Sequence, residues 1–131
     1  MAILGIYGAL RGKKREIFDG IFEVDTLDEC LVILNRKTFC EFRFNERLCD
    51  GWHLYVVELC MRIKTANGLV VVTNHDITHL SIGNVNESYM KTYKRLMNAY
   101  KNEKWICTTC KTLPNNNIVF LLYYILFCNL Q

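Results

Sequence analysis

The segment DGWHLYVVELCMRIKTANGLVVVTNHDITHLS, from Asp50 to Ser81, carries the clearest periodic pattern in the chain. Apolar residues recur with helical spacing between Trp52 and Thr65, and Asn67-Gly68 is a typical helix stop. Leu69 to Thr73 is then a valine-rich run typical of a strand. The segment therefore predicts a helix followed by a strand, and we expect Asp50 to be the helix N-cap.

The ends of these two elements carry polar side chains that are suited to chemistry. Asp50 and His53 lie at the predicted helix start, and His79 lies just past the predicted strand. In α/β enzymes, helix starts and strand ends are where side chains are presented to a ligand. These three residues are therefore candidates for a functional site.

Further strands and one more helix are predicted on both sides of this segment. Glu29 to Leu34 reads ECLVIL, which is typical of a buried strand, and Ala2 to Ala9 reads as a strand running into a turn. Ile21 to Asp25 is a short strand candidate. Ser88 to Lys104 has a tyrosine-rich face and a basic face, as in a helix packed on a core. The order of elements predicts an α/β arrangement of two or three layers.

Composition sets limits on the class of protein. The 131 residues fit one domain, and 51% hydrophobic with 22% charged residues is a globular profile rather than a disordered one. The net charge of +3 is too mild to indicate a nucleic-acid partner. The basic clusters at Arg11 to Arg15 and Lys91 to Lys104 are expected to be solvated faces, with contact to an anionic ligand as the less favoured alternative.

The cysteines indicate a reducing compartment. Seven cysteines cannot all pair within one chain, and Cys30 and Cys60 stand in apolar runs, where cysteine behaves as a small hydrophobe. The apolar start of the chain precedes its basic cluster, which is the reverse of a secretory signal. We therefore expect a cytoplasmic protein with reduced thiols.

The C-terminal part is unusually apolar. Ile118 to Cys128 reads IVFLLYYILFC, whereas a membrane-spanning helix needs about 20 residues. The run could form a buried strand, a helix, or a docking surface for a protein or a membrane surface, and its β-branched and aromatic residues favour the strand. We therefore divide the chain into a domain at 1–113 and a tail at 114–131.

Two further groups of residues have a functional interpretation and a structural one. Asp25, Asp28 and Glu29, in VDTLDEC, could act as a base or contact sugar hydroxyls, although a solvated turn is the more favoured interpretation. Trp52 could stack on a sugar or base ring, or it could support the core.

A zinc site is a weaker alternative. His75 and His79 are four residues apart, and Cys107 and Cys110 form a C-x-x-C pair. Together these side chains could form a zinc-stabilised binding module. No second Cys or His pair follows the C-x-x-C, so the spacing supports this alternative poorly.

An ordered series of motifs carries a family resemblance. The series GIYGA, FEVDTLDECLVILNRKTF, FRFNERLCDGWHLYVVELCMRIKTANGLVVV and HLSIGN resembles the C-terminal half of bacterial glycosyltransferases. These enzymes have the GT-A fold of nucleotide-diphospho-sugar transferases and belong to the inverting family-two group, in its lipopolysaccharide and capsule branch. The resemblance covers Ile3 to about Cys110. It implies a partial GT-A-like mixed sheet with flanking helices, and sugar transfer to a saccharide acceptor in cell-surface polysaccharide synthesis.

The resemblance also implies roles for individual residues. A nucleotide-sugar donor and a divalent metal, Mn or Mg, would be bound, with His79 near the metal or the diphosphate. Asp25 and Asp28 would line the acceptor side, and Trp52 with His53 would form its helix start. Asp50 would be the catalytic base.

Two departures from the family pattern qualify these roles. Many relatives carry an acidic residue three positions after the histidine of the helix-start motif, and this chain has Val56, so Asp50 or His53 must replace the base or the base is lost. The chain also contains no D-x-D metal motif and lacks the nucleotide-binding half of the fold. We therefore expect a truncated transferase that is inactive alone. The alternative is a non-catalytic interaction module that pairs with a donor-binding chain or with a second copy.

Overall fold

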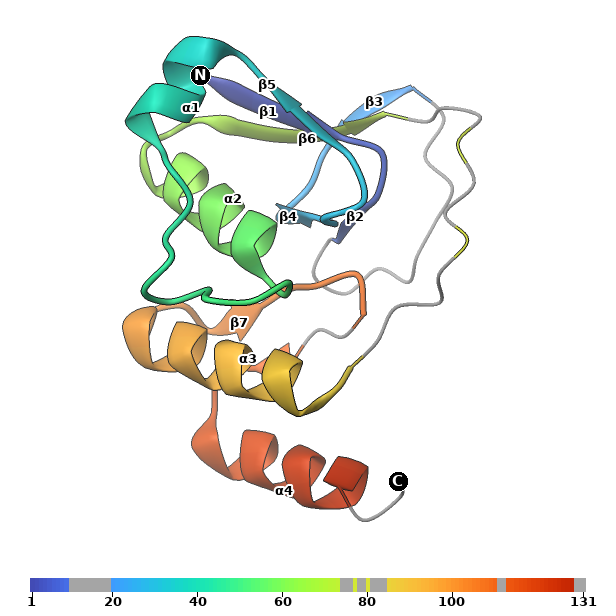
Figure 1. Cartoon of the computed structure of the whole chain (residues 1–131), viewed down its shortest axis with the longest axis vertical. Coiled ribbons are helices and arrows are strands. Elements are labelled where there is room, and N and C mark those ends of the chain that lie inside the picture. The colour runs from blue at the N-terminus through green and yellow to red at the C-terminus, as the bar shows by residue number, and fades with distance from the viewer. Residues whose placement is uncertain (10–19, 74–76, 78–79, 81–84, 111–112, 129–131) are drawn as a thin grey trace.

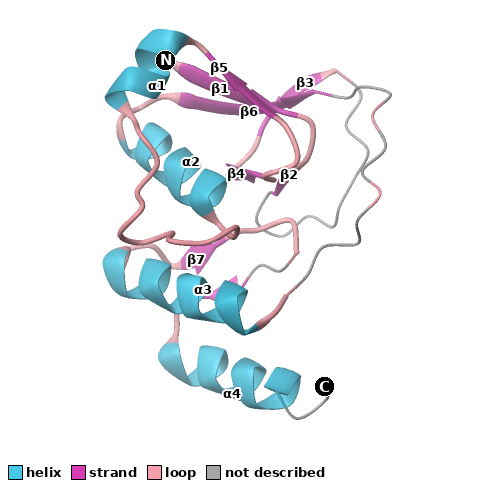
Figure 2. Ribbon diagram, in the orientation of Figure 1, coloured by secondary structure: helices cyan, strands magenta, loops and turns pink. Residues whose placement is uncertain are grey.

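The protein is a mixed α/β domain built on a four-stranded mixed sheet. The computed structural model describes residues 1–9, 20–73, 77, 80, 85–110 and 113–128. The strands of this sheet follow the order β3-β6-β1-β5, with bounds Ile21–Glu23, Leu69–Thr73, Ala2–Gly5 and Val32–Leu34. β1 and β6 are parallel, whereas β3 and β5 are antiparallel to their neighbours. The predicted α/β class and the mixed sheet with flanking helices are therefore confirmed (Figure 2).

Helix α2 (Tyr55–Thr65) covers one face of this sheet (Figure 1). Ile3, Val70 and Val72 point toward the helix and are almost fully buried, as the period-two alternation of strands requires. The helix buries its apolar stripe against them through Val56, Leu59, Cys60 and Ile63. The predicted amphipathic helix and the strand at 69–73 are therefore confirmed.

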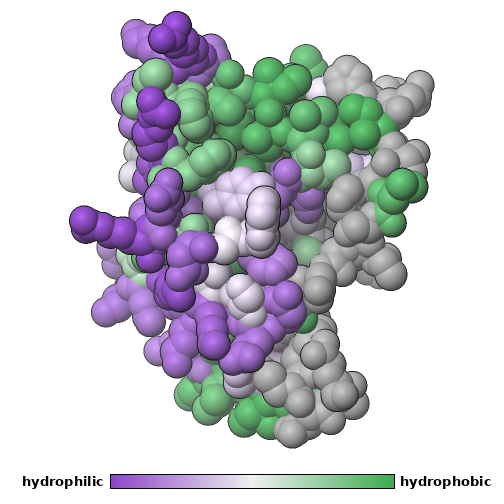
Figure 3. Space-filling view, in the orientation of Figure 1, coloured by the Kyte–Doolittle hydropathy of each residue, from purple (hydrophilic) through white to green (hydrophobic). Residues whose placement is uncertain are grey.

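The opposite face of the sheet is apolar and exposed. Ile33 and Ile21 are 58% and 71% exposed, and Leu69 is 51% exposed. Leu4 is opposite Ile33 and Val71 in the strand register, so these side chains share the outer face. Figure 3 shows apolar side chains gathered over the strands at the top of the molecule.

A second core joins α2 to the C-terminal helices. α3 (Glu87–Ala99) and α4 (Asn117–Cys128) follow α2 in Figure 1, with α4 at the end of the molecule opposite the sheet. The buried members of this core include Leu54, Tyr93, Leu96, Ile106 and Phe120. The remaining elements are short: β2 (Gly8–Ala9), β4 (Thr26–Leu27), α1 (Arg36–Glu41), β7 (Trp105–Ile106) and β8 (Leu113–Pro114).

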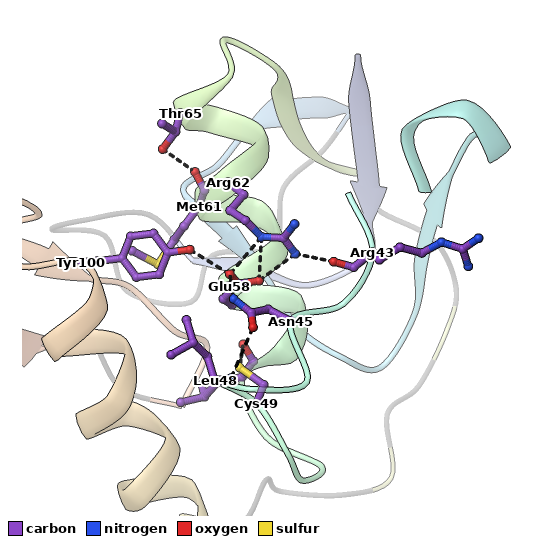
Figure 4. Close-up of polar contacts among 10 residues, drawn as sticks. Arg43, Asn45, Leu48, Cys49, Glu58, Met61, Arg62, Thr65 and Tyr100 are labelled. Carbon is purple, nitrogen blue, oxygen red and sulfur yellow. Dashed lines mark hydrogen bonds and ion pairs between the residues drawn. The ribbon is translucent and has the colours of Figure 1, made fainter. Parts of the chain in front are cut away.

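A buried carboxylate lies between the two cores and accepts hydrogen bonds from the segments around it (Figure 4). Glu58 of α2 is fully buried and accepts hydrogen bonds from Arg62 Nε, Asn45 Nδ2 and the Tyr100 hydroxyl at 2.9, 3.1 and 2.8 Å. Arg62 also donates to the carbonyl of Arg43 at 2.6 Å. Because its charge is paired and its oxygens are hydrogen-bonded, Glu58 has a structural role.

The structure corrects the predicted start of α2. The helix begins at Tyr55, its N-cap residue is Leu54, and Leu54 makes no side-chain cap. Asp50 is not the N-cap, because its carboxylate instead binds Arg95 Nη1 of α3 at 2.6 Å. A long-range ion pair thus replaces the expected local cap.

The structure also decides the conformation of the apolar C-terminal run. The run forms α4 instead of the favoured strand. Asn116 accepts a hydrogen bond from the N–H of Ile118 at 2.8 Å and so caps the start of the helix. In the part of the chain that the structure describes, no helix is long and apolar enough to cross a membrane.

Candidate active site

The turn between β4 and β5 places a carboxyl group in unusual surroundings. Glu29 Oε1 is buried and has no hydrogen-bond partner among the described residues. Burial and the neighbouring charge of Asp28 raise the pKa of Glu29 to about 7, although backbone N–H groups that include those of Leu54 and Val56 oppose the shift. Glu29 is therefore near half-ionised at neutral pH, a property suited to a general acid or base.

Asp28 is held in place beside Glu29. One carboxylate oxygen accepts a hydrogen bond from the backbone N–H of Cys30 at 2.9 Å. The other accepts a hydrogen bond from the Thr109 hydroxyl, which comes from the segment after β7. One local contact and one contact from a distant part of the chain therefore fix the orientation of this carboxylate.

The start of α2 contributes a strained backbone. Leu54 has a φ of 66°, in the left-handed region that side-chain-bearing residues rarely adopt. Its side chain is only 2% exposed, so packing in the second core holds this conformation. Such strain costs on the order of 1–3 kcal/mol and is concentrated at functional sites. It occurs here at the residue whose N–H acts on Glu29.

His53, just before α2, contacts residues at the start of α3. Its ring lies edge-on to Tyr89, with 5.6 Å between the ring centroids. Partial burial lowers the pKa of His53, and a hydrogen bond with Asn86 opposes that shift. The Tyr89 hydroxyl in turn lies 2.8 Å from the hydroxyl of Thr108. His53 is therefore a positioned, mainly neutral imidazole at neutral pH.

Aromatic rings are also present at this end of α2. Trp52 is 86% exposed, so its ring is open to a ligand rather than part of the core. Burial raises the pKa of Tyr55, and the charges of Glu29 and Asp28 add to the effect. The carboxylates and Tyr55 therefore share one electrostatic environment.

Two of the predicted residues have other surroundings. Asp50 is exposed, and the hydrogen bond from Arg95 lowers the pKa of its carboxyl, which makes it a weaker base. Asp25 binds Lys64 Nζ at 2.8 Å near the C-terminal end of α2. It lines a cavity of about 530 Å³ together with Lys64, Trp105 and Cys107. The structure therefore gathers Asp28, Trp52 and His53 around the start of α2, and places Asp25 at the other end of that helix.

Val56 lies in the core rather than at a surface. Its side chain is fully buried against the sheet, so an acidic side chain at this position would enter the apolar core. The backbone N–H of the same residue acts on Glu29. Glu29, from the turn before β5, is thus a carboxyl group close to the backbone of Val56.

The predicted metal ligands cannot be assembled from the described residues. His75 and His79 lie outside them. Cys107 is buried with its thiol 3.7 Å from Asp25 Oδ2, whereas Cys110 is exposed. Within the described ranges, no three His, Cys, Asp or Glu side chains form a group that could hold a metal ion.

Thr109 is a site residue that the sequence did not predict. Glu29 was one of three carboxylates predicted in the acidic turn VDTLDEC, and the structure distinguishes it from Asp25 and Asp28 by the burial of its unpartnered oxygen. Thr109 lies between the two cysteines of the C-x-x-C pair, and the pattern there pointed to the cysteines.

Comparison of the chain with family models, with curated proteins and with solved structures finds no match.

Proposed function

We propose that this chain provides the acceptor side of an inverting glycosyltransferase of the GT-A type, for cell-surface polysaccharide synthesis. The family-two resemblance is the source of the reaction class. The site adds a carboxyl group, a neutral imidazole and an exposed indole around the start of α2. Sugar rings bind to such sites by stacking on an aromatic face and by hydrogen bonding to carboxylates.

The surroundings of Glu29 carry the proposal. Glu29 has a buried, unpartnered oxygen and a pKa of about 7, and Asp28 lies next to it in the chain. A general base works best when its pKa lies near the working pH. Asp50, the base implied by the resemblance, has a lowered pKa and a cationic partner. We therefore assign the base to Glu29 and the orientation of the acceptor to Asp28 and Trp52.

The proposed step is a single displacement. The Glu29 carboxylate takes the proton of an acceptor hydroxyl, and the acceptor oxygen forms a bond to the anomeric carbon of the donor. The bond from that carbon to the diphosphate breaks, and the nucleoside diphosphate leaves with the electron pair. His53 lies at the edge of this site, where a neutral imidazole can accept or donate a hydrogen bond to the saccharide.

We expect the donor and the metal to be held mainly by a partner chain. The chain has no D-x-D motif, and the described residues offer no group of three metal ligands. His79 remains the residue proposed to lie near the metal or the diphosphate. The chain therefore needs a donor-binding partner for transfer.

Saccharide binding tests the acceptor assignment. We expect saturation-transfer NMR with a panel of hexoses and disaccharides to detect millimolar binding to the whole chain. Trp52→Ala and Asp28→Asn should abolish the signal. Asp50→Asn is the matched control, because it makes the same chemical change at an exposed carboxylate, and it should leave binding intact. Binding that survives both site variants would contradict the assignment.

Calorimetry tests whether this chain binds the nucleotide-sugar donor by itself. We expect no heat of binding when uridine or guanosine diphosphate sugars with manganese are titrated into the chain at millimolar concentration. Measurable donor binding would instead show that the chain holds a donor site of its own.

A non-catalytic pairing module is the second candidate. The exposed apolar outer face of the sheet favours it, because Ile21, Ile33 and Leu69 present an uncovered surface to a partner. A chain that serves only for pairing would give no saccharide signal in the NMR experiment.

A further inference from the structure

Helix α4 exposes a stripe of aliphatic side chains that has no charge. The stripe consists of the exposed side chains Ile118, Leu121, Leu122, Ile125 and Leu126. At 3.6 residues per turn, these five positions cover roughly 140° of the helix circumference. No residue of α4 is charged. An exposed aliphatic surface of this kind is typical of a docking surface rather than of a solvated face.

The inner face of α4 has a different composition and is already used. Phe120 is 6% exposed and stacks on Tyr93 of α3, with 6.1 Å between the ring centroids. Tyr124 stacks on Phe120 at 6.2 Å. Aromatic packing therefore attaches the helix to the domain and orients the aliphatic stripe outward.

Lysines of α3 border the same side of the molecule. A groove of about 560 Å³ between α3 and α4 has Lys91 and Lys94 on one wall and Leu121 and Tyr124 on the other. Lys91 pairs with Glu87, but both side chains are more than half exposed, so this ion pair is weak. Figure 3 shows green apolar side chains along the lower end of the molecule, next to the purple polar surface above them.

The charges decide between two possible occupants. Two copies joined through their α4 stripes would bring lysines of one copy toward those of the other, with no acid on α4 and with Glu87 already paired to Lys91. An anionic lipid surface satisfies both features, because acyl chains receive the aliphatic stripe and head groups attract the lysines. Tyrosines such as Tyr124 are also enriched at such interfaces.

We propose that α4 and the lysine-bearing face of α3 dock this protein on an anionic membrane surface. α4 lies in the plane of the interface with Leu122 and Ile125 among the acyl chains. Its 12 residues extend about 18 Å along that plane. Lys91 and Lys94 lie at the level of the phosphate groups.

Vesicle co-sedimentation of the full chain tests this proposal. We expect binding to vesicles of phosphatidylcholine mixed with phosphatidylglycerol, and much weaker binding to phosphatidylcholine alone. The double variant Leu122→Asn/Ile125→Asn should lower the partition coefficient at least tenfold. Its matched control is Ile21→Asn/Ile33→Asn, which makes the same change on exposed residues of the sheet and should bind like the wild type.

A second pair of variants tests the electrostatic part. Lys91→Gln/Lys94→Gln should weaken binding to the anionic vesicles by roughly fivefold per lysine and leave binding to neutral vesicles unchanged. The control Arg36→Gln/Lys37→Gln removes two charges from α1 and should have no effect. None of these variants alters Glu29, Asp28 or Trp52, so saccharide binding reports separately on the proposed function.

Three outcomes would overturn the proposal. The first is unchanged vesicle binding by the α4 variant. The second is loss of binding by the sheet variant instead. The third is a dimer in sedimentation velocity that the α4 variant dissociates, together with no vesicle binding by the wild type, which would identify a second copy as the occupant.

Discussion

Replacing Glu29 with glutamine should make the protein more stable at alkaline pH while removing its proposed catalytic group. The pKa of Glu29 is about 7 in the folded protein, against an ordinary value of 4.5. The folded state therefore binds the proton more tightly than the unfolded state does. The free energy of unfolding falls as pH rises from 4.5 to 7 and is level above that range. Glutamine has nearly the same shape as glutamate and cannot ionise. The free energy of unfolding of the variant therefore does not fall in this way as pH rises.

The magnitude follows from the size of the pKa shift. At about 1.4 kcal/mol per pKa unit, the full interval corresponds to roughly 3 kcal/mol. Between about pH 5 and about pH 8.5, the advantage of the variant in unfolding free energy should grow by roughly 2.5 kcal/mol. Urea denaturation followed by circular dichroism at the two pH values measures this change.

Glu58→Gln is the matched control for this experiment. Glu58 is also a carboxyl group in the interior, but it accepts hydrogen bonds from Arg62, Asn45 and Tyr100. This variant should lose several kcal/mol at both pH values, because it weakens a buried ion pair. If the advantage of Glu29→Gln stayed constant with pH, the proposed burial of an uncompensated carboxyl would be wrong.

Three further predictions concern stability and ionisation. Tyr100→Phe removes the hydrogen bond to Glu58 and should lower the free energy of unfolding by about 1.5–3 kcal/mol in urea denaturation, and an unchanged midpoint would count against that bond. The imidazole of His53 should titrate below pH 6.5 in proton NMR, because burial opposes its charge, and a midpoint above that value would place it in solvent. Gly68→Ala should cost about 1–3 kcal/mol, because a Cβ there would lie 2.6 Å from Ile63 Cγ2 and 2.9 Å from the Ile63 carbonyl oxygen; a neutral substitution would refute this close approach.

The helix at Tyr55–Thr65 and the strand at Leu69–Thr73 were predictable because their patterns are local. The side-chain period reports burial directly, and Asn67-Gly68 ends the helix by backbone conformation. The start of α2 was not predictable in the same way. Asp50 has the chemistry of an N-cap, but Arg95, 45 residues away in sequence, binds it instead.

The conformation of the apolar run at Ile118–Cys128 was ambiguous because its composition favours a strand while its spacing fits a helix. Tyr123 and Tyr124 lie three and four residues after Phe120, and all three share the inner face of α4. This spacing was a usable signal, together with Asn116 as an N-cap. The strand predicted from its β-branched and aromatic residues was wrong, because tertiary packing overrides strand propensity.

The candidate site was predictable only in part. Trp52 and His53 follow from their place at a helix start, and Asp28 follows from its turn. The raised pKa of Glu29 depends on burial in the folded chain, and the N–H groups of Leu54 and Val56, which are distant in sequence, act on the same carboxyl. No local pattern distinguishes a buried, unpartnered carboxyl from a solvated one.

The most direct test of the proposed acceptor site is a carbon NMR titration of the Glu29 carboxyl, assigned with Glu29→Gln, with and without saccharide. We predict a midpoint near pH 7 without ligand and a shift of the resonance when saccharide binds. A midpoint near the ordinary value for glutamate, with no response to saccharide, would contradict Glu29 as the base of this site.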